Sequence, residues 1–240
     1  MKLLLSALSM MLLTISFAQA ETVQFQASDG VTVTADFNAP KADYAAVIVL
    51  FHMAGASRGE YQKIAERLNG LGYATLAVDQ RSGGQINGVR NETVKSAGGS
   101  TNFVQAIPDL VAASDWARQN TDARRVGVLG SSYSAGLVLV LSAQDKTFAD
   151  AVMSFSPGEY YGSSNYVAKE LGGMQVPAFL TSARGEAGQW KPFAKKIGSP
   201  VVEFVPKGSG RHGASALDSG DGAEYWSALE GFLEKYLPAG

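Results

Sequence analysis

Two patterns of apolar and polar positions divide this chain into expected strands and helices. Residues 23–27 and 31–37 alternate apolar and polar side chains on either side of Ser28-Asp29-Gly30, a pattern that predicts a β-hairpin with a tight turn. The later strand-like segments are continuously apolar, as expected of strands that are buried on both faces of a sheet. They are residues 45–51, 73–78, 125–129, 150–155, 176–180 and 201–205.

Apolar positions with helical spacing occupy the segments between these strands. The predicted helices cover residues 60–71, 103–118, 134–143, 189–197 and 223–237. This alternation favours a doubly wound, mostly parallel sheet that begins with an antiparallel hairpin. We therefore expect one α/β domain over residues 21–240. The long, glycine-containing connections at 81–101 and 157–175 are expected to form the walls of a pocket.

The segment 1–20 is expected to lie outside this domain. Lys2 gives it a basic start, residues 3–17 form an apolar run, and 18–20 read AQA, a small-x-small pattern that signal peptidase recognises. A membrane anchor is the alternative, for which the run is short. We therefore predict a signal peptide over residues 1–20 and a protein that is periplasmic or secreted.

Composition narrows the chemistry that this domain can perform. The chain has no cysteine, two histidines and a net charge of −2. The lack of cysteine excludes a thiol nucleophile, disulfide bonds and cysteine-ligated metal sites, and two histidines argue against a histidine-rich metal site. The small net charge argues against nucleic acid or an anionic membrane as a partner. Composition therefore argues against a metal site and against nucleic acid or membrane as a partner.

The strongest motif is GSSYSAG at residues 130–136, directly after the predicted strand 125–129. A serine on a sharp strand-to-helix turn is exposed as a nucleophile, and the positions two residues before and after it must be small. For Ser132 these are Gly130 and Ser134, where the usual G-x-S-x-G pattern has a second glycine. Ser134 itself is the alternative nucleophile. A phosphate-binding loop is a weaker alternative, because the glycines do not form G-x-G-x-x-G.

A nucleophilic serine needs a base, and the base needs an acid that orients it. In this architecture the order along the chain is serine, acid and histidine. His212 lies in the loop after the last predicted strand and is expected to be the base. Glu186 follows the strand 176–180 and is expected to be the acid. Asp218 and Asp221 are alternative acids, although they follow His212 in the chain.

Acyl transfer also needs N–H groups that stabilise the developing oxyanion. We expect these from the backbone of Tyr133, next to the nucleophile, and of Met53, in the loop after the strand 45–51. His52 precedes Met53 and is expected to shape that loop. The side chains expected to contact substrate are those of His52, Tyr160, Tyr161 and Trp190.

These motifs resemble the α/β-hydrolase superfamily, and within it the dienelactone-hydrolase-like branch. The resemblance covers nearly all of residues 21–240 and rests on FHMAG (51–55), SRGEY (57–61), VDQRSGG (78–84), GSSYS (130–134) and SFSPGEY (154–160). It implies an eight-stranded sheet with helices on both faces and cofactor-free hydrolysis through an acyl-enzyme. The order of the motifs leaves no room for a large cap domain.

By motif position, the resemblance carries the nucleophile to Ser132, the base to His212 and the acid to Glu186. Serine stands where dienelactone hydrolases proper carry a cysteine nucleophile, which favours a general esterase. The sequence therefore predicts a serine carboxylesterase for small or medium acyl esters. A peptidase or thioesterase would use the same triad. The alternative from another class is an inactive hydrolase fold that binds a ligand or a partner.

Overall fold

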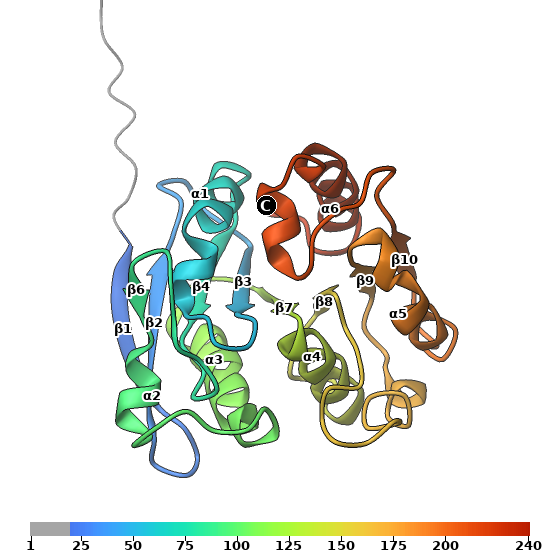
Figure 1. Ribbon diagram of the computed structural model, residues 1–240. Helices are drawn as coiled ribbons and strands as arrows, with labels where there is room; N and C mark the ends of the chain where they lie inside the picture. The colour runs from blue at the N-terminus through green and yellow to red at the C-terminus, as the bar shows by residue number, and fades with distance from the viewer. Residues whose placement is uncertain (1–19) are drawn as a thin grey trace, which may run out of the picture.

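An eight-stranded sheet forms the centre of the molecule (Figure 1). The structure is a computed structural model that describes residues 20–240, so the predicted signal peptide lies, apart from its last residue, outside the described residues. Along the sheet, β1 and β2 form an antiparallel hairpin, β2 pairs antiparallel with β4, and the remaining pairs are parallel. The strands, in sheet order, are β1 (Glu21–Gln26), β2 (Thr32–Asn38), β4 (Ala74–Val78), β3 (Ala46–Phe51), β7 (Arg125–Ser131), β8 (Ala151–Phe155), β9 (Ala178–Thr181) and β10 (Val201–Phe204).

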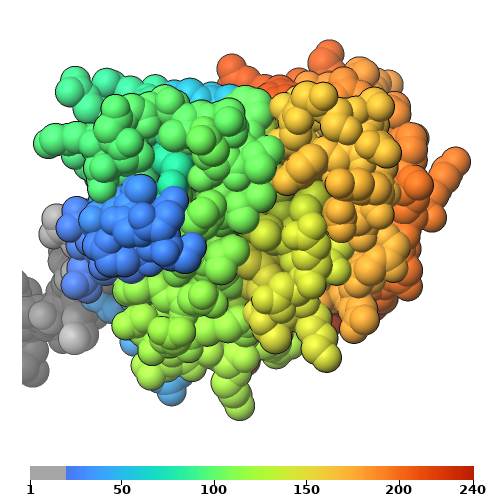
Figure 2. All heavy atoms as spheres, turned by 90° about the horizontal axis from the view of Figure 1, so that it is seen from below, coloured from blue at the N-terminus to red at the C-terminus, as the bar shows by residue number. Residues whose placement is uncertain are grey.

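Helices cover both faces of the sheet. One face carries α1 (Gln62–Gly70) and α6 (Gly222–Tyr236), and the other carries α3 (Ile107–Asn120), α4 (Tyr133–Gln144) and α5 (Ala187–Ala194). Figure 2 looks onto the second face, where α3 and α4 run from green to yellow. This is the α/β-hydrolase arrangement that the sequence predicts. Within residues 20–240, every helix is too short or too polar to cross a membrane.

The central strands are buried on both sides because their side chains alternate between two cores. In β3, Val47 and Val49 enter the core shared with α3 and α4, whereas Ile48 and Leu50 enter the core shared with α1 and α6. Full burial of such a side chain contributes roughly 1.5–3 kcal/mol. A strand with an apolar layer on each face must be apolar at every position, which accounts for the continuous runs in the sequence.

The two long connections differ in structure. Residues 81–101 contain a small hairpin, β5 (Gln85–Ile86) with β6 (Val89–Arg90), and the short helix α2 (Glu92–Ser96). Residues 157–175 contain one 3₁₀ turn, η3 (Leu171–Gly173). The other 3₁₀ turns are η1 (Arg58–Tyr61), η2 (Val104–Ala106), η4 (Arg184–Glu186) and η5 (Ala214–Asp218). The predicted helices at 60–71 and 103–118 therefore begin with η1 and η2.

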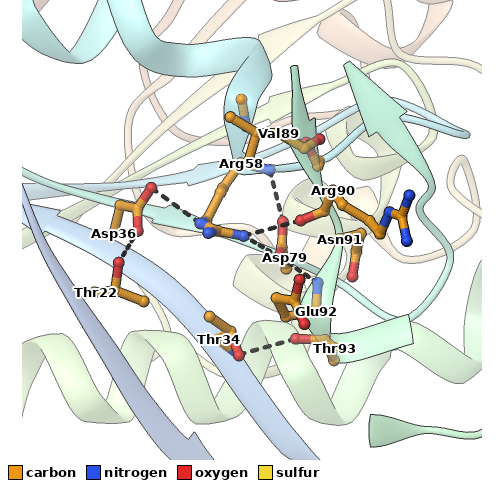
Figure 3. A network of polar contacts seen from close by, with 12 residues as sticks. Thr22, Thr34, Asp36, Arg58, Asp79, Val89, Arg90, Asn91, Glu92 and Thr93 are labelled. Carbon is orange, nitrogen blue, oxygen red and sulfur yellow. Dashed lines mark hydrogen bonds and ion pairs between the residues drawn. The ribbon is translucent and has the colours of Figure 1, made fainter. Parts of the chain in front are cut away.

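A buried ion-pair network fixes η1 beside the end of β4 (Figure 3). The carboxylate of Asp79 accepts hydrogen bonds from the Arg58 backbone N–H at 2.8 Å, from Arg58 Nη1 at 2.6 Å and from the Glu92 N–H at 2.8 Å. Arg58 Nε also pairs with Asp36 of β2 at 2.9 Å. The network joins η1, α2 and β2, and so gives the segment after β3 a rigid support.

Asn91 anchors the same connection from within. Its Oδ1 accepts from the Val94 N–H at 2.9 Å and caps α2, and its Nδ2 donates to the Gln80 carbonyl at 2.8 Å. The side chain is buried, and a Cβ added at Gly83 would lie 2.1 Å from Nδ2. The amide nitrogen therefore has no free space around it.

Candidate active site

Ser132 lies on the turn between β7 and α4, in a backbone conformation that few non-glycine residues adopt. Its φ is +60° and its ψ is −121°, a combination that costs of order 1–3 kcal/mol and is concentrated at functional sites. Gly130 permits the turn, because a Cβ there would lie 2.5 Å from the carbonyl oxygen of Ser134. The side chain is thereby lifted to the carboxyl ends of the parallel strands, where ligands bind in open α/β sheets.

Ser134 occupies the position where the usual motif has glycine, and its hydroxyl is fully used within the fold. It donates to the His52 carbonyl at 2.7 Å and accepts from Gln80 Nε2 at 2.7 Å. The residue has no exposed surface. Ser134, the alternative nucleophile, therefore ties α4 to the segment after β3 and has no access to a substrate.

The structure brings Ser132, His212 and Glu186 together in one continuous chain of hydrogen bonds. The distance from His212 Nε2 to Ser132 Oγ is 2.8 Å, and the distance from His212 Nδ1 to Glu186 Oε1 is also 2.8 Å. A carboxylate only accepts, so Nδ1 donates to Glu186 and leaves Nε2 to accept from the serine hydroxyl. This tautomer is the one that a general base beside a serine nucleophile requires.

The alternative acids lie elsewhere. Asp221 Oδ2 accepts from the Gly210 N–H at 2.8 Å and so fixes the backbone of the loop that leads to His212. Asp218 lies at the end of η5 and lines a cavity beside the site. The Nδ1 of His212 is already satisfied by Glu186.

Ser156, directly after β8, makes polar contacts with the site that the sequence does not predict. Its hydroxyl donates to Glu186 Oε2 at 2.7 Å and accepts from the Gly213 N–H at 2.9 Å. Its backbone φ is +58°. Ser156 therefore orients the carboxylate and holds the backbone next to His212. Two features of the sequence point to it: its place directly after a buried strand and its position in the SFSPGEY motif.

A second acidic residue, Glu60 of η1, lies on the other side of the nucleophile. Its Oε1 accepts from the Ser131 hydroxyl at 2.7 Å, and its Oε2 accepts from the Met53 backbone N–H at 2.7 Å. Glu60 is only 4% exposed. Burial raises the pKa of the Glu60 carboxyl to about 6, and the hydrogen bonds from Met53 and Ser131 oppose this rise. Glu60 lies in the SRGEY motif, which does not by itself indicate these contacts.

The two expected oxyanion donors differ in their present partners. The Tyr133 N–H is at the first position of α4, where backbone N–H groups have no partner within their own helix. The Met53 N–H, by contrast, donates to Glu60. The Tyr133 N–H therefore has no acceptor within its own helix, whereas the Met53 N–H already donates to Glu60.

Two of the side chains expected to contact substrate do not reach the surface, which corrects those predictions. His52 has no exposed surface; Nδ1 donates to the Met53 carbonyl at 2.8 Å, and Nε2 accepts from the Gln80 N–H at 3.0 Å. Burial lowers the pKa of His52 to about 4, so the ring is neutral. Trp190 is also fully buried, and its Nε1 donates to Ser182 Oγ at 2.7 Å. His52 shapes its loop, and Trp190 belongs to the core.

The comparisons with known proteins agree with this geometry. A family model described as serine aminopeptidase, S33, matches residues 42–186, more than half of the chain. The chain belongs to this family of α/β hydrolases. The matched range contains Ser132 and Glu186. A search of curated proteins found no match to the sequence of this chain.

Solved structures share the fold of this S33 hydrolase at low sequence identity. An esterase of Pyrococcus furiosus is 19% identical, with a TM-score of 0.72 and coverage of 91% of this chain and 93% of the esterase. Dienelactone hydrolase from Anabaena variabilis is 18% identical, with a TM-score of 0.70 over 91% and 98% of the two chains. An acylaminoacyl peptidase of Pyrococcus horikoshii is 18% identical, with a TM-score of 0.65, over 92% of this chain and 42% of its own. Family and fold together identify a hydrolase of the serine α/β type.

Two cavities of the hydrolase are lined by residues that contact the segments carrying the triad. The first, of about 470 Å³, is lined by Asn102, Phe103, Val104, Tyr160, Tyr161 and Gly162. In Figure 2 the green segment before α3 and the golden segment after β8, which supply these residues, meet on the face shown. Phe103 stacks on Tyr133 with ring centroids 4.3 Å apart, so this aromatic cavity adjoins the residue after the nucleophile. Tyr160 and Tyr161, two of the side chains expected to contact substrate, line this cavity.

The second cavity, of about 620 Å³, has charged side chains as well as apolar ones in its lining. It opens beside Met53 and Glu60 and is also lined by Lys63, Arg211, Ser215 and Asp218. Ser215 Oγ donates to the His212 carbonyl at 2.8 Å, which places this cavity next to the base. Within residues 20–240, His, Asp and Glu side chains form no group of three or more that could hold a metal ion.

Proposed function

We propose that the protein is a carboxylesterase in which Ser132, His212 and Glu186 form the catalytic triad. The observation that carries the proposal is the unbroken chain of 2.8 Å contacts from Glu186 through His212 to Ser132. The residues come from three separate loops at the carboxyl ends of the strands, and their types, order and tautomer suit acyl transfer.

The proposed reaction proceeds in two halves. His212 Nε2 removes the proton of Ser132 as Oγ attacks the ester carbonyl carbon, and Glu186 stabilises the imidazolium that forms. The Tyr133 N–H stabilises the oxyanion of the tetrahedral intermediate, with the Met53 N–H as a second donor once it is shared with Glu60 or released by it. His212 then gives its proton to the leaving alcohol. Water, deprotonated by His212, attacks the acyl-enzyme and releases the acid and Ser132.

The two cavities suit an ester in which one substituent is apolar and the other carries polar groups. The aromatic side chains of Phe103, Tyr160 and Tyr161 provide an apolar wall for one group. Lys63 and Arg211 provide a polar wall for the other. At about 470 and 620 Å³, both lie within the range of sites for small molecules. This supports a small or medium ester.

Peptide hydrolysis is the second candidate, and the family model favours it, because that model describes a serine aminopeptidase. The acylaminoacyl peptidase of Pyrococcus horikoshii shares the fold over 92% of this chain. The same triad cleaves esters and amides, so the leaving group must be determined by assay.

The test is hydrolysis of p-nitrophenyl esters from acetate to decanoate, beside a matched panel of aminoacyl p-nitroanilides. We expect turnover on the esters that is lost in Ser132→Ala and retained in Ser134→Ala. Turnover on the anilides alone would favour the peptidase. No turnover on either panel, together with no labelling of Ser132 by a fluorophosphonate probe, would contradict both functions and favour the inactive binding protein.

A further inference from the structure

Two consecutive backbone N–H groups after His212 are held in the same manner. The Gly213 N–H donates to Ser156 Oγ at 2.9 Å, and that hydroxyl donates to Glu186 at 2.7 Å. The next N–H, of Ala214, donates to Ser131 Oγ at 2.9 Å, and that hydroxyl donates to Glu60 at 2.7 Å. Each serine hydroxyl has one hydrogen, so each carboxylate fixes the direction of its serine. The loop that carries His212 is therefore tied to two carboxylates.

The second carboxylate also reaches the segment after β3. Glu60 Oε2 accepts from the Met53 N–H, while Oε1 accepts from Ser131, the residue directly before the nucleophile. One side chain thus connects three segments: the loop that supplies an oxyanion donor, the strand end that presents Ser132, and the loop that carries His212. No substitution of equal shape reproduces this, because glutamine offers only one acceptor oxygen.

The position of Glu60 is itself well supported. Its neighbour Arg58 is fixed by Asp79 and Asp36 in the network of Figure 3. A buried carboxylate is costly unless hydrogen bonds compensate it, and Glu60 has such bonds on both oxygens. An apolar side chain at this position would leave the Met53 N–H and the Ser131 hydroxyl without their acceptors, so the carboxylate does more than fill space.

We propose that Glu60 is a positioning residue of the reaction, which holds the Met53 loop and the His212 loop in register with Ser132. This inference rests on the proposed function, because it assigns a residue to that same site. It acts without touching substrate: through Ser131 it sets the backbone beyond the base, and directly it sets the loop of the second oxyanion donor. A displacement of about 1 Å in such groups can cost about 10²-fold in rate.

The experiment compares Glu60→Gln, Ser131→Ala and the double variant with the unmodified protein on a p-nitrophenyl ester. Active sites are counted by fluorophosphonate titration, and kcat is expressed per titrated site. We expect Glu60→Gln to lower kcat about 10–100-fold while KM changes less than about threefold. Because Glu60 acts partly through Ser131, the double variant should be little worse than the more severe single variant.

The control is Asp150→Asn. Asp150 accepts from the Val126 N–H at 2.7 Å and pairs with Arg118, at the opposite end of the strands from Ser132. The Asp150→Asn variant is expected to have a lower Tm and an unchanged kcat per titrated site. A structural role for Glu60 would give this same result, so a Glu60→Gln kcat within twofold of the unmodified protein would overturn the inference. Multiplicative effects of Glu60→Gln and Ser131→Ala would overturn the relay.

Two further outcomes remain distinguishable. If Glu60→Gln fails to fold, Ser131→Ala still tests the relay, because it keeps Glu60 and removes only the hydroxyl; kcat unchanged in that variant would contradict the inference. If the unmodified protein neither turns over substrate nor takes up the probe, the proposed function fails rather than the role of Glu60.

Discussion

The hydroxyl of Ser134 donates to the carbonyl oxygen of His52 at 2.7 Å and so joins two segments that are 82 residues apart in the chain. Gln80 completes the contact, since its Nε2 donates to Ser134 and its Oε1 accepts from the His52 N–H. The side chain that departs from the usual glycine therefore connects the nucleophile turn to the segment that supplies an oxyanion donor.

The two serines of this turn are expected to respond differently to removal of their hydroxyls. Ser132→Ala should lower kcat by about 10⁴-fold or more, because the nucleophile is lost. Ser134→Ala should lower the free energy of unfolding by about 1–2 kcal/mol, because the buried His52 carbonyl loses a donor, with kcat changed less than about tenfold. Ester hydrolysis and urea unfolding of both variants check this. Loss of activity in Ser134→Ala alone would transfer the nucleophile to Ser134.

Replacement of the acid should impair the base without removing it. Glu186→Gln loses the charge that stabilises the imidazolium and presents an N–H₂ group to Ser156, so kcat should fall about 10²–10⁴-fold. His212→Ala should cost at least as much. Asp218→Asn is the matched control, with kcat expected within about twofold of the unmodified protein. A larger loss of kcat in Asp218→Asn than in Glu186→Gln would show that the acid is wrongly assigned.

His52 should make the fold sensitive to acid. Burial lowers the pKa of His52 to about 4 from 6.5, so the neutral ring contributes stability above pH 6.5 that is lost as the pH falls towards 4. The shift corresponds to about 3 kcal/mol. His52→Gln lacks this titration. Urea unfolding of both proteins between pH 7 and pH 4 gives the difference in their free energies of unfolding. Contributions from groups present in both proteins, such as Glu60, cancel in this difference. A difference that stays constant with pH would contradict the prediction.

The network around η1 should be essential for stability. Asp79→Ala removes three hydrogen bonds at once and leaves a mostly buried guanidinium without its closest partner. We expect the free energy of unfolding to fall by about 3 kcal/mol or more. Asp36→Ala removes only the more exposed partner of Arg58 and should cost less than about 1 kcal/mol. Thermal or urea unfolding gives both values; equal effects would argue against a dominant role for Asp79.

The sequence predicts the sheet well because its strongest signals come from physical necessity. A strand such as β3 has an apolar core on each side, so apolar side chains are required at all of its positions. The turn at Ser132 requires a small residue at Gly130. The serine, acid and histidine follow in the order that the topology imposes, and the structure brings them within hydrogen-bond distance.

The supporting contacts could not be predicted in the same way. Ser131 and Ser156 are ordinary serines at strand ends, and their partners lie 83 and 57 residues away in the loop after His212. The predicted substrate contacts of His52 and Trp190 are wrong, because proximity to a site in sequence does not say which way a side chain points. Orientation depends on packing between distant elements, which no local pattern records.

The burial of Asn91 has a consequence for how the protein is made. Asn91-Glu92-Thr93 is a sequon for N-linked glycosylation, yet its acceptor nitrogen donates to Gln80 and is enclosed by the backbone. An oligosaccharide on that nitrogen would displace the anchor of the connection 81–101. In a glycosylating host, modification before folding would therefore produce a misassembled chain. Expression in a host that does not glycosylate this sequon avoids that outcome and keeps the Nδ2 donation to Gln80.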